Sequence, residues 1–165
     1  MALRNIVTKE DSVLHKVCRE QVKFDERLHQ LLDDMAETLE KANGVGLAAP
    51  QVGILRRVVL VLETNVLDDE DEQILELINP EIIESSGEQV GAEGCLSVPG
   101  EYGIVHRPSN VVVRAQDRDG RWFKYEGHGL TARCICHELD HLDGHLFTEK
   151  AERMLSKDEI RREVE

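Results

Sequence analysis

The sequence predicts a single α+β domain with mostly antiparallel or mixed β-sheets packed around a central helix, and further helices near the N- and C-termini. Two observations favour this class. Strand-like apolar segments fill the middle of the chain, whereas helical patterns precede and follow them, and this order differs from alternating β-α units. No internal repeat or long linker divides residues 1–165, a length that can bury a real core. Because aromatic residues make up only 4% of the chain, we expect an aliphatic core.

The N-terminal part predicts two helices. A short one is expected over 11–18, with Asp11 as its N-cap. The first strong helix is expected over 25–42, capped by Asp25, because leucines and a methionine recur there at three- and four-residue steps. Gly44 is expected in the left-handed position that follows the helix.

The middle of the chain predicts a small uncharged segment followed by strands. The segment over 44–53 is rich in glycine and lacks charge, and an acidic run over 68–72 is typical of a solvated loop tip. Asp119-Gly120 is a strong signal for a two-residue type I′ turn that closes a hairpin. The expected strands cover 58–62, 74–78, 81–84, 111–116 and 121–125.

Two more helices are predicted in the last third. The first runs from about His128 to Asp143, where Gly144 would end it. The second begins at Ser156, because Ser156 and Glu159 form the capping-box pattern, and it continues to Glu165.

Composition and charge exclude several classes of protein. The formal net charge of −13 argues against binding nucleic acid through a broad basic surface. The start of the chain lacks the apolar core of a signal peptide, and the longest run of large apolar residues, 58–62, is far shorter than a membrane span. With four cysteines and no export signal, we expect reduced thiols and a cytoplasmic protein.

A metal-binding pattern lies within the predicted 128–143 helix. Residues 137–141 read His-Glu-Leu-Asp-His, so His137 and His141 share one face of the helix and can hold one divalent metal ion. Glu138 can reach the same side and act as general base on a metal-bound water. A catalytic site of this kind needs a third protein ligand and an open position for water.

Several residues are candidates for the third ligand. Metzincins place a histidine where this chain has Phe147, and Gly144 is expected to end the helix before His145. Glu159 has the spacing found in another type of zinc peptidase. Cys95 follows Gly94, which permits close approach of the backbone, and its thiolate is a strong soft ligand.

Three stretches of the chain resemble the peptide deformylase family. They are Gly44-Val-Gly-Leu-Ala-Ala-Pro-Gln51, Glu93-Gly-Cys-Leu-Ser97 and His137-Glu-Leu-Asp-His-Leu-Asp-Gly144. Together, in this order and in a chain of this length, they are very specific. The resemblance covers nearly the whole chain and weakens only over the final helix. It implies that Cys95, His137 and His141 hold the metal, usually Fe²⁺, with Ni²⁺, Co²⁺ or Zn²⁺ able to replace it.

The resemblance also implies the reaction. The enzyme would remove the N-terminal formyl group from N-formylmethionyl peptides of newly made proteins and release formate. Glu138 would handle protons, while the side-chain amide of Gln51 and the backbone N–H of Leu96 would face the formyl oxygen. The expected partners are nascent peptides, with the ribosome near its exit tunnel as a further candidate. The sequence predicts neither an oligomeric state nor the native metal.

We expect the remaining site residues to bind substrate. Cys134 would form the wall of a pocket for a methionine-like side chain, with Val45 and Leu130 as neighbours and Arg133 at its rim. The glycines of the first two stretches, Gly44, Gly46 and Gly94, would leave room for a peptide bound as an added strand.

The sequence leaves the effect of one unusual residue and two alternative functions open. Cys136 stands where the family usually has Gln, which we expect to affect packing around the site. A zinc endopeptidase that uses Glu159 is one alternative function. The other is a closed, non-catalytic metal site made of Cys95, Cys134, His137 and His141.

Overall fold

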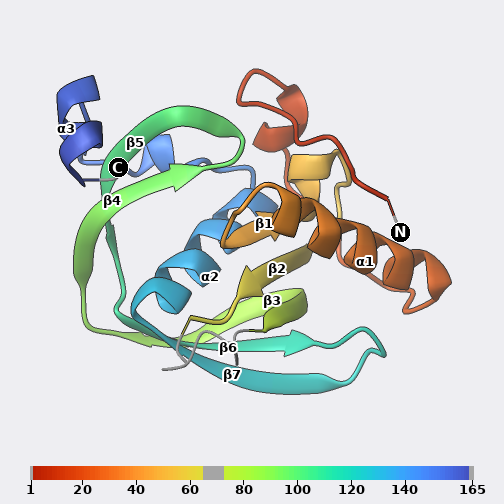
Figure 1. Cartoon of the computed structure of the whole chain (residues 1–165). Coiled ribbons are helices and arrows are strands. Elements are labelled where there is room, and N and C mark those ends of the chain that lie inside the picture. Colours follow the sequence, from red (N-terminus) through yellow and green to blue (C-terminus); the bar gives the residue numbers. More distant parts are fainter. Residues whose placement is uncertain (1, 65–72, 164–165) are drawn as a thin grey trace.

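The computed structural model describes residues 2–64 and 73–163, which form two β-sheets and three α-helices (Figure 1). The first sheet has five strands in the order β1-β2-β3-β6-β7, and the second has three in the order β4-β5-β8, with every paired strand antiparallel. The bounds are Gly46–Ala48 (β1), Val58–Leu62 (β2), Ile74–Ser86 (β3), Gln89–Cys95 (β4), Val98–Arg107 (β5), Asn110–Gln116 (β6), Trp122–His128 (β7) and Arg153–Met154 (β8). The prediction of an α+β fold is confirmed.

The helices are α1 (Glu26–Lys41), α2 (Gly129–Leu142) and α3 (Lys157–Glu163), and α2 passes between the two sheets (Figure 1). Helix α2 contacts both sheets, whereas α1 packs on the five-stranded sheet. Strand β2 is buried on both faces: Val59 and Val61 pack in the cluster around α2, whereas Val58 and Leu60 pack against α1. The five-stranded sheet therefore has α1 on one face and α2 on the other. Within the described residues, no helix has the length and apolar character that crossing a membrane requires.

Most predicted helix boundaries agree with the structure. Asp25 caps α1 by accepting the Leu28 N–H at 3.2 Å, and Ser156 and Glu159 form the reciprocal bonds of a capping box before α3. The predicted 11–18 helix is reduced to a short 3₁₀ turn over Ser12–His15. Asn43, with φ +55°, takes the left-handed position that we expected for Gly44.

The strand predictions were less complete. Ile74–Ser86 is one strand in which Asn79, at φ +52°, forms a bulge, so the two predicted strands are joined. Strands β4 and β5 were missed because glycines and Pro99 interrupt them. The 44–53 segment forms β1 and a 3₁₀ turn over Ala49–Val52. The acidic run 68–72 lies outside the described residues.

The β6–β7 turn also differs from the prediction. The Gly120 N–H donates to the Asp117 carbonyl at 3.0 Å, and within residues 117–121 only Gly120 has a positive φ, +85°. A type I′ turn needs positive φ at both central residues, so this is a three-residue turn with a left-handed glycine. The Asp117 carboxylate stabilises it by accepting the N–H groups of Asp119 and Arg121 at 2.9 and 3.0 Å.

Gly144 ends α2 as predicted, and we expect its replacement by Ala to destabilise the fold. Its φ is +82°, and an added Cβ would lie 2.8 Å from the main-chain carbon of His15. The strained backbone alone costs about 1–3 kcal/mol, and the clash adds to it. Gly53→Ala is a matched control, because Gly53 has φ +83° and no atom within 4 Å of an added Cβ. Urea unfolding should therefore show a larger loss for Gly144→Ala, and equal midpoints would contradict this.

Candidate active site

Helix α2 places the metal-binding pattern in the interior. His137 and His141 lie one turn apart, with their ring centroids 5.0 Å apart, and Glu138 is beside them. All three side chains are buried. Phe147, which stands where a metzincin would have histidine, packs its ring on His137 at a centroid distance of 6.1 Å.

Cys95 joins the two histidines from the end of β4. Its Sγ lies 3.3 Å from His141 Nε2, and one donor atom from each of Cys95, His137 and His141 lies within 4.8 Å of the others. Within residues 2–64 and 73–163, this is the one group of three such residues at that spacing. Bonds of about 2.0–2.3 Å, typical of metal–N and metal–S ligation, allow one ion to reach all three atoms. The donor set therefore fits a divalent metal ion.

The other candidate ligands have different partners. Glu159 accepts the Ser156 N–H and pairs with Arg153 at 2.8 Å. Its carboxylate is therefore engaged near the start of α3 and is not grouped with His137 and His141. Cys134 donates its S–H to the Val45 carbonyl at 3.2 Å. His145 is exposed and lies 3.3 Å from Glu149. The geometry thus favours Cys95 over Glu159 and over a closed site with four ligands.

Glu93 is the functional residue that our sequence analysis missed. It is buried on β4 and accepts a hydrogen bond from His137 Nδ1 at 2.6 Å, which leaves Nε2 of His137 for another ligand. Its two oxygens also pair with Arg107 at 2.6 and 3.1 Å and with Arg133 at 2.8 Å. Burial raises the pKa of Glu93, but the hydrogen bonds from His137 and Arg107 outweigh burial and bring it down to about 2.

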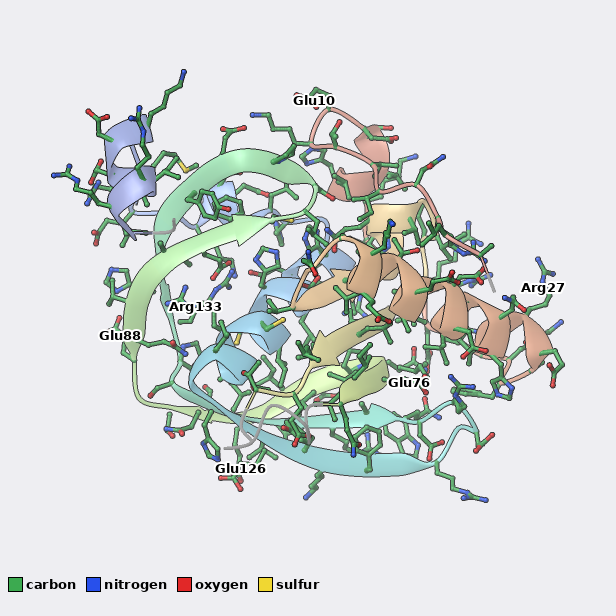
Figure 2. The ribbon with its side chains drawn as sticks, viewed as in Figure 1. Glu10, Arg27, Glu76, Glu88, Glu126 and Arg133 are labelled. Atoms are coloured by element: carbon green, nitrogen blue, oxygen red, sulfur yellow. The ribbon has the colours of Figure 1, made fainter. Side chains whose placement is uncertain are left out.

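Arg133 differs in position from the prediction that it lies at the rim. It lines the cavity, but its guanidinium is buried against Glu93 and also donates to the Val105 carbonyl at 3.2 Å. Figure 2 shows Arg133 between α2 and β4. Arg133 therefore helps to fix Glu93, which in turn holds the His137 ring.

We expect Glu93→Gln to weaken metal binding and stability. The change removes the charge that faces two buried guanidinium groups. It also replaces one of the two oxygens that accept from His137 and the arginines by an NH₂ group, which cannot accept. Losing such an outer partner lowers metal affinity about 10–100-fold, and breaking a buried ion pair costs about 3–5 kcal/mol. Chelator competition and urea unfolding measure the two effects. Glu88→Gln is the control, because Glu88 makes a similar pair with His106 at 2.8 Å on the surface (Figure 2). Equal metal affinity in both variants would contradict the prediction.

The Glu138 side chain is buried from solvent. Its Oε1 is buried without a hydrogen-bond partner among the described residues, and burial raises its pKa to about 7. Gly46 on β1 gives it room: a Cβ atom at Gly46 would lie 2.5 Å from Glu138 Oε2 and equally close to Cys134 Sγ. The glycine is thus required by the close approach of β1 to α2.

Gln51 is fixed so that its amide nitrogen faces Cys95. Its Oε1 accepts the Ala48 N–H at 2.9 Å, and its Nε2 lies 3.0 Å from Ser97 Oγ and 3.5 Å from Cys95 Sγ. Leu96 and Ser97 form the two-residue turn between β4 and β5. Two hydrogen-bond donors, the side-chain amide of Gln51 and the backbone N–H of Leu96, thus lie beside Cys95.

A cavity of about 460 Å³ connects these groups. Its walls come from β1 and β4, which are edge strands of their sheets, and from α2. Val45 and Leu130 are exposed at its mouth, whereas Cys134 is buried. The predicted pocket residues Val45, Gly46, Gly94, Leu130, Arg133 and Cys134 all line it. Cys136 instead packs in the core cluster around α2, where burial raises its pKa to about 11.

Comparison with known proteins gives consistent matches. The profile of the polypeptide deformylase family matches residues 3–157. The peptide deformylase of Caldicellulosiruptor bescii is 54% identical over 160 residues, covering 97% of this chain and 92% of the relative. That of Agathobacter rectalis is 56% identical over 155 residues, covering 94% of each chain.

Solved structures agree with these matches. The crystal structure of a peptide deformylase from Legionella pneumophila has a TM-score of 0.83 at 40% identity and covers 98% of this chain and 92% of its own. A Met-Ala-Ser-bound class I type b peptide deformylase from Acinetobacter baumannii has a TM-score of 0.82 at 35% identity, with 90% and 98% covered. This chain belongs to the polypeptide deformylase family.

Proposed function

We propose that residues 1–165 form one catalytic domain that hydrolyses the N-terminal formamide of N-formylmethionyl peptides, giving formate and a free amine. The arrangement of Cys95, His137 and His141 beside Glu138 in a cavity open to two sheet edges carries this proposal. Cys95, His137 and His141 would hold one divalent metal, Fe²⁺ in the first place, with Zn²⁺, Ni²⁺ or Co²⁺ as substitutes. A bound divalent metal would lower the pKa of a coordinated water to about 7, far below that of free water.

Glu138 moves the proton. Its carboxylate is buried next to His137, and one of its oxygens is free of hydrogen bonds within the described residues. It takes a proton from the attacking water and later gives it to the leaving amine nitrogen. The Cys134 and Gly46 atoms packed against it keep bulk water away from the carboxylate.

Gln51 and Leu96 stabilise the developing charge on the formyl oxygen. The Ala48 N–H and Ser97 Oγ hold the Gln51 amide so that its nitrogen points to the side of Cys95. The Leu96 N–H follows Cys95 directly in the chain. Each such donor, fixed before the substrate arrives, is worth about 3 kcal/mol of the barrier.

The peptide binds as an added strand between the edges of β1 and β4. Gly46 and Gly94 carry no side chain that would block its backbone, and each edge strand has unpaired main-chain groups on the cavity side. The side chain of the first residue enters the pocket formed by Val45, Leu130 and Cys134. The mostly apolar wall suits methionine.

The cellular setting follows from this substrate. The partners are formylated nascent peptides, met in the cytoplasm near the exit tunnel of the ribosome. All four cysteines are free, as in a reducing compartment. The Acinetobacter baumannii relative, solved with Met-Ala-Ser bound, supports a site for a peptide that begins with methionine.

Metal analysis of anaerobically purified protein, coupled to a formyl-Met peptide assay, tests the proposal. We expect about one metal ion per chain and equal amounts of formate and free amine. The Fe²⁺-loaded protein is assayed without oxygen, and the Ni²⁺-loaded protein is assayed in parallel. If neither the Fe²⁺-loaded nor the Ni²⁺-loaded protein hydrolysed the formyl-Met peptide, the proposed function would be refuted.

A further inference from the structure

The N-terminal segment 6–9 contacts the main chain of two loops that border the metal-donor residues. It contains no helix or strand. The Val7 N–H donates to the Gln51 carbonyl at 2.8 Å, and the Lys9 N–H donates to the Ser97 carbonyl at 2.9 Å. Figure 1 shows the red N-terminal segment running from the side of α1 toward the turn that joins β4 and β5. One short segment thus holds both loops.

The two loops belong to different sheets. Gln51 lies in the 3₁₀ turn after β1 of the five-stranded sheet, whereas Leu96 and Ser97 form the turn after β4 of the three-stranded sheet. The Gln51 side chain contacts Ser97 Oγ at 3.0 Å, which orients the amide. The position of each loop's main chain depends on other bonds, and segment 6–9 supplies one such bond to each loop.

Side chains anchor segment 6–9 to both parts of the molecule. Ile6 packs against the core cluster around α1, and Val7 packs against the smaller cluster that contains Phe147. The Lys9 ammonium pairs with Glu101 of β5 at 2.5 Å. The segment is therefore held on either side of the two hydrogen bonds, so these bonds can fix one loop relative to the other.

We infer that the main-chain N–H groups of Val7 and Lys9 position the two proposed donors to the formyl oxygen. They would set the distance between the Gln51 amide and the Leu96 N–H. This inference rests on the proposed function. Donors of this kind act at about 2.7–3.1 Å from the charged oxygen, and a displacement of about 1 Å is enough to slow a reaction severely. Loss of either bond should therefore lower kcat more than it raises KM.

Lys9→Pro tests the bond to Ser97. The Asp11 N–H donates to the Thr8 carbonyl at 2.9 Å, so Lys9 is the second residue of a turn, a position that favours proline. The change suits the turn but removes the N–H. Lys9→Ala is the matched control, because it keeps the N–H and loses the same contact with Glu101. With Ni²⁺-loaded protein and formyl-Met-Ala-Ser, we expect kcat to be about 10–100-fold lower in Lys9→Pro than in Lys9→Ala, with KM and bound metal unchanged.

Val7→Pro tests the bond to Gln51, with Thr8→Pro as its control. The Thr8 N–H has no hydrogen-bond partner in the described part of the chain, so a proline there removes neither bond. Val7→Pro should lower kcat by a similar factor, whereas Thr8→Pro should not. In a Gln51→Ala background, Val7→Pro should change kcat by less than about twofold, because the donor that it positions is already absent. A purely structural role would give the same loss in both backgrounds.

Three results would overturn the inference. They are equal kcat in Lys9→Pro and Lys9→Ala, a Val7→Pro effect that is undiminished in the Gln51→Ala background, and a loss of metal that accounts for the lower kcat. Urea unfolding shows which variants are folded, and if Val7→Pro is not, the comparison of the two Lys9 variants decides. Each result is distinguishable from failure of the proposed function, because in that case the wild-type protein would hydrolyse no formylated peptide.

Discussion

Replacing Glu138 with Gln is expected to lower kcat for formyl-Met peptides by about 10²–10⁴-fold, the usual contribution of a positioned acid or base, with bound metal unchanged. Gln has nearly the same shape but cannot take up the proton of water at neutral pH. Because Glu138 Oε1 has no hydrogen-bond partner among the described residues, the amide should not reduce the free energy of unfolding. Steady-state kinetics, metal content and urea unfolding measure the three quantities.

Glu37→Gln is the matched control for this experiment. Glu37, on α1, also has a buried carboxylate oxygen without a partner in the described part of the chain, but it does not line the cavity. Its replacement should leave kcat and metal content unaltered. If Glu138→Gln kept wild-type kcat, the proton-transfer role would be wrong, and if it lost metal, Glu138 would act in ligation or packing instead.

The local part of the site was predictable from the sequence. The spacing of His137 and His141 fixes their common helix face, and the Ser156 capping box fixes the start of α3. Cys95 lies on a strand far from these histidines in sequence, so no local pattern brings it to them. Only the resemblance to a family placed the thiol beside the imidazoles, where the structure also has it.

The support of the site was harder to foresee. Glu93 reads as an ordinary acidic residue, and its role depends on two arginines from β5 and α2 that no spacing rule connects. One pattern in the sequence could have revealed it. Side chains two residues apart on a strand lie on the same face, so residue 93 must face the same side as Cys95. That signal was hidden, because the glycine-rich β4 was not predicted as a strand. Strand propensity failed here because Gly91 and Gly94 lower it, although both residues lie within β4.

Replacing Cys95 with Ala is expected to remove the metal and, with it, all formyl-peptide hydrolysis. Two imidazoles would remain, and the loss in affinity should exceed the roughly 10–100-fold that an outer partner contributes. Metal content after dialysis against a weak chelator measures this directly. The fold should persist, because Cys95 is only partly buried and packs at the margin of the smallest core cluster, so its replacement by Ala removes one sulfur atom and leaves the buried members of that cluster in place.

Cys134→Ala and Glu159→Ala separate the three readings of the metal site. Both variants should keep the metal, since Cys134 donates to the Val45 carbonyl and Glu159 pairs with Arg153. A closed structural site would lose metal in Cys134→Ala as well as in Cys95→Ala. A zinc endopeptidase arrangement would lose it in Glu159→Ala and keep it in Cys95→Ala. In the proposed arrangement, Cys95 would be the third ligand and Cys134 would stay in the pocket wall. A four-coordinate metal would then keep one position for water, which is what separates a hydrolytic site from a structural one.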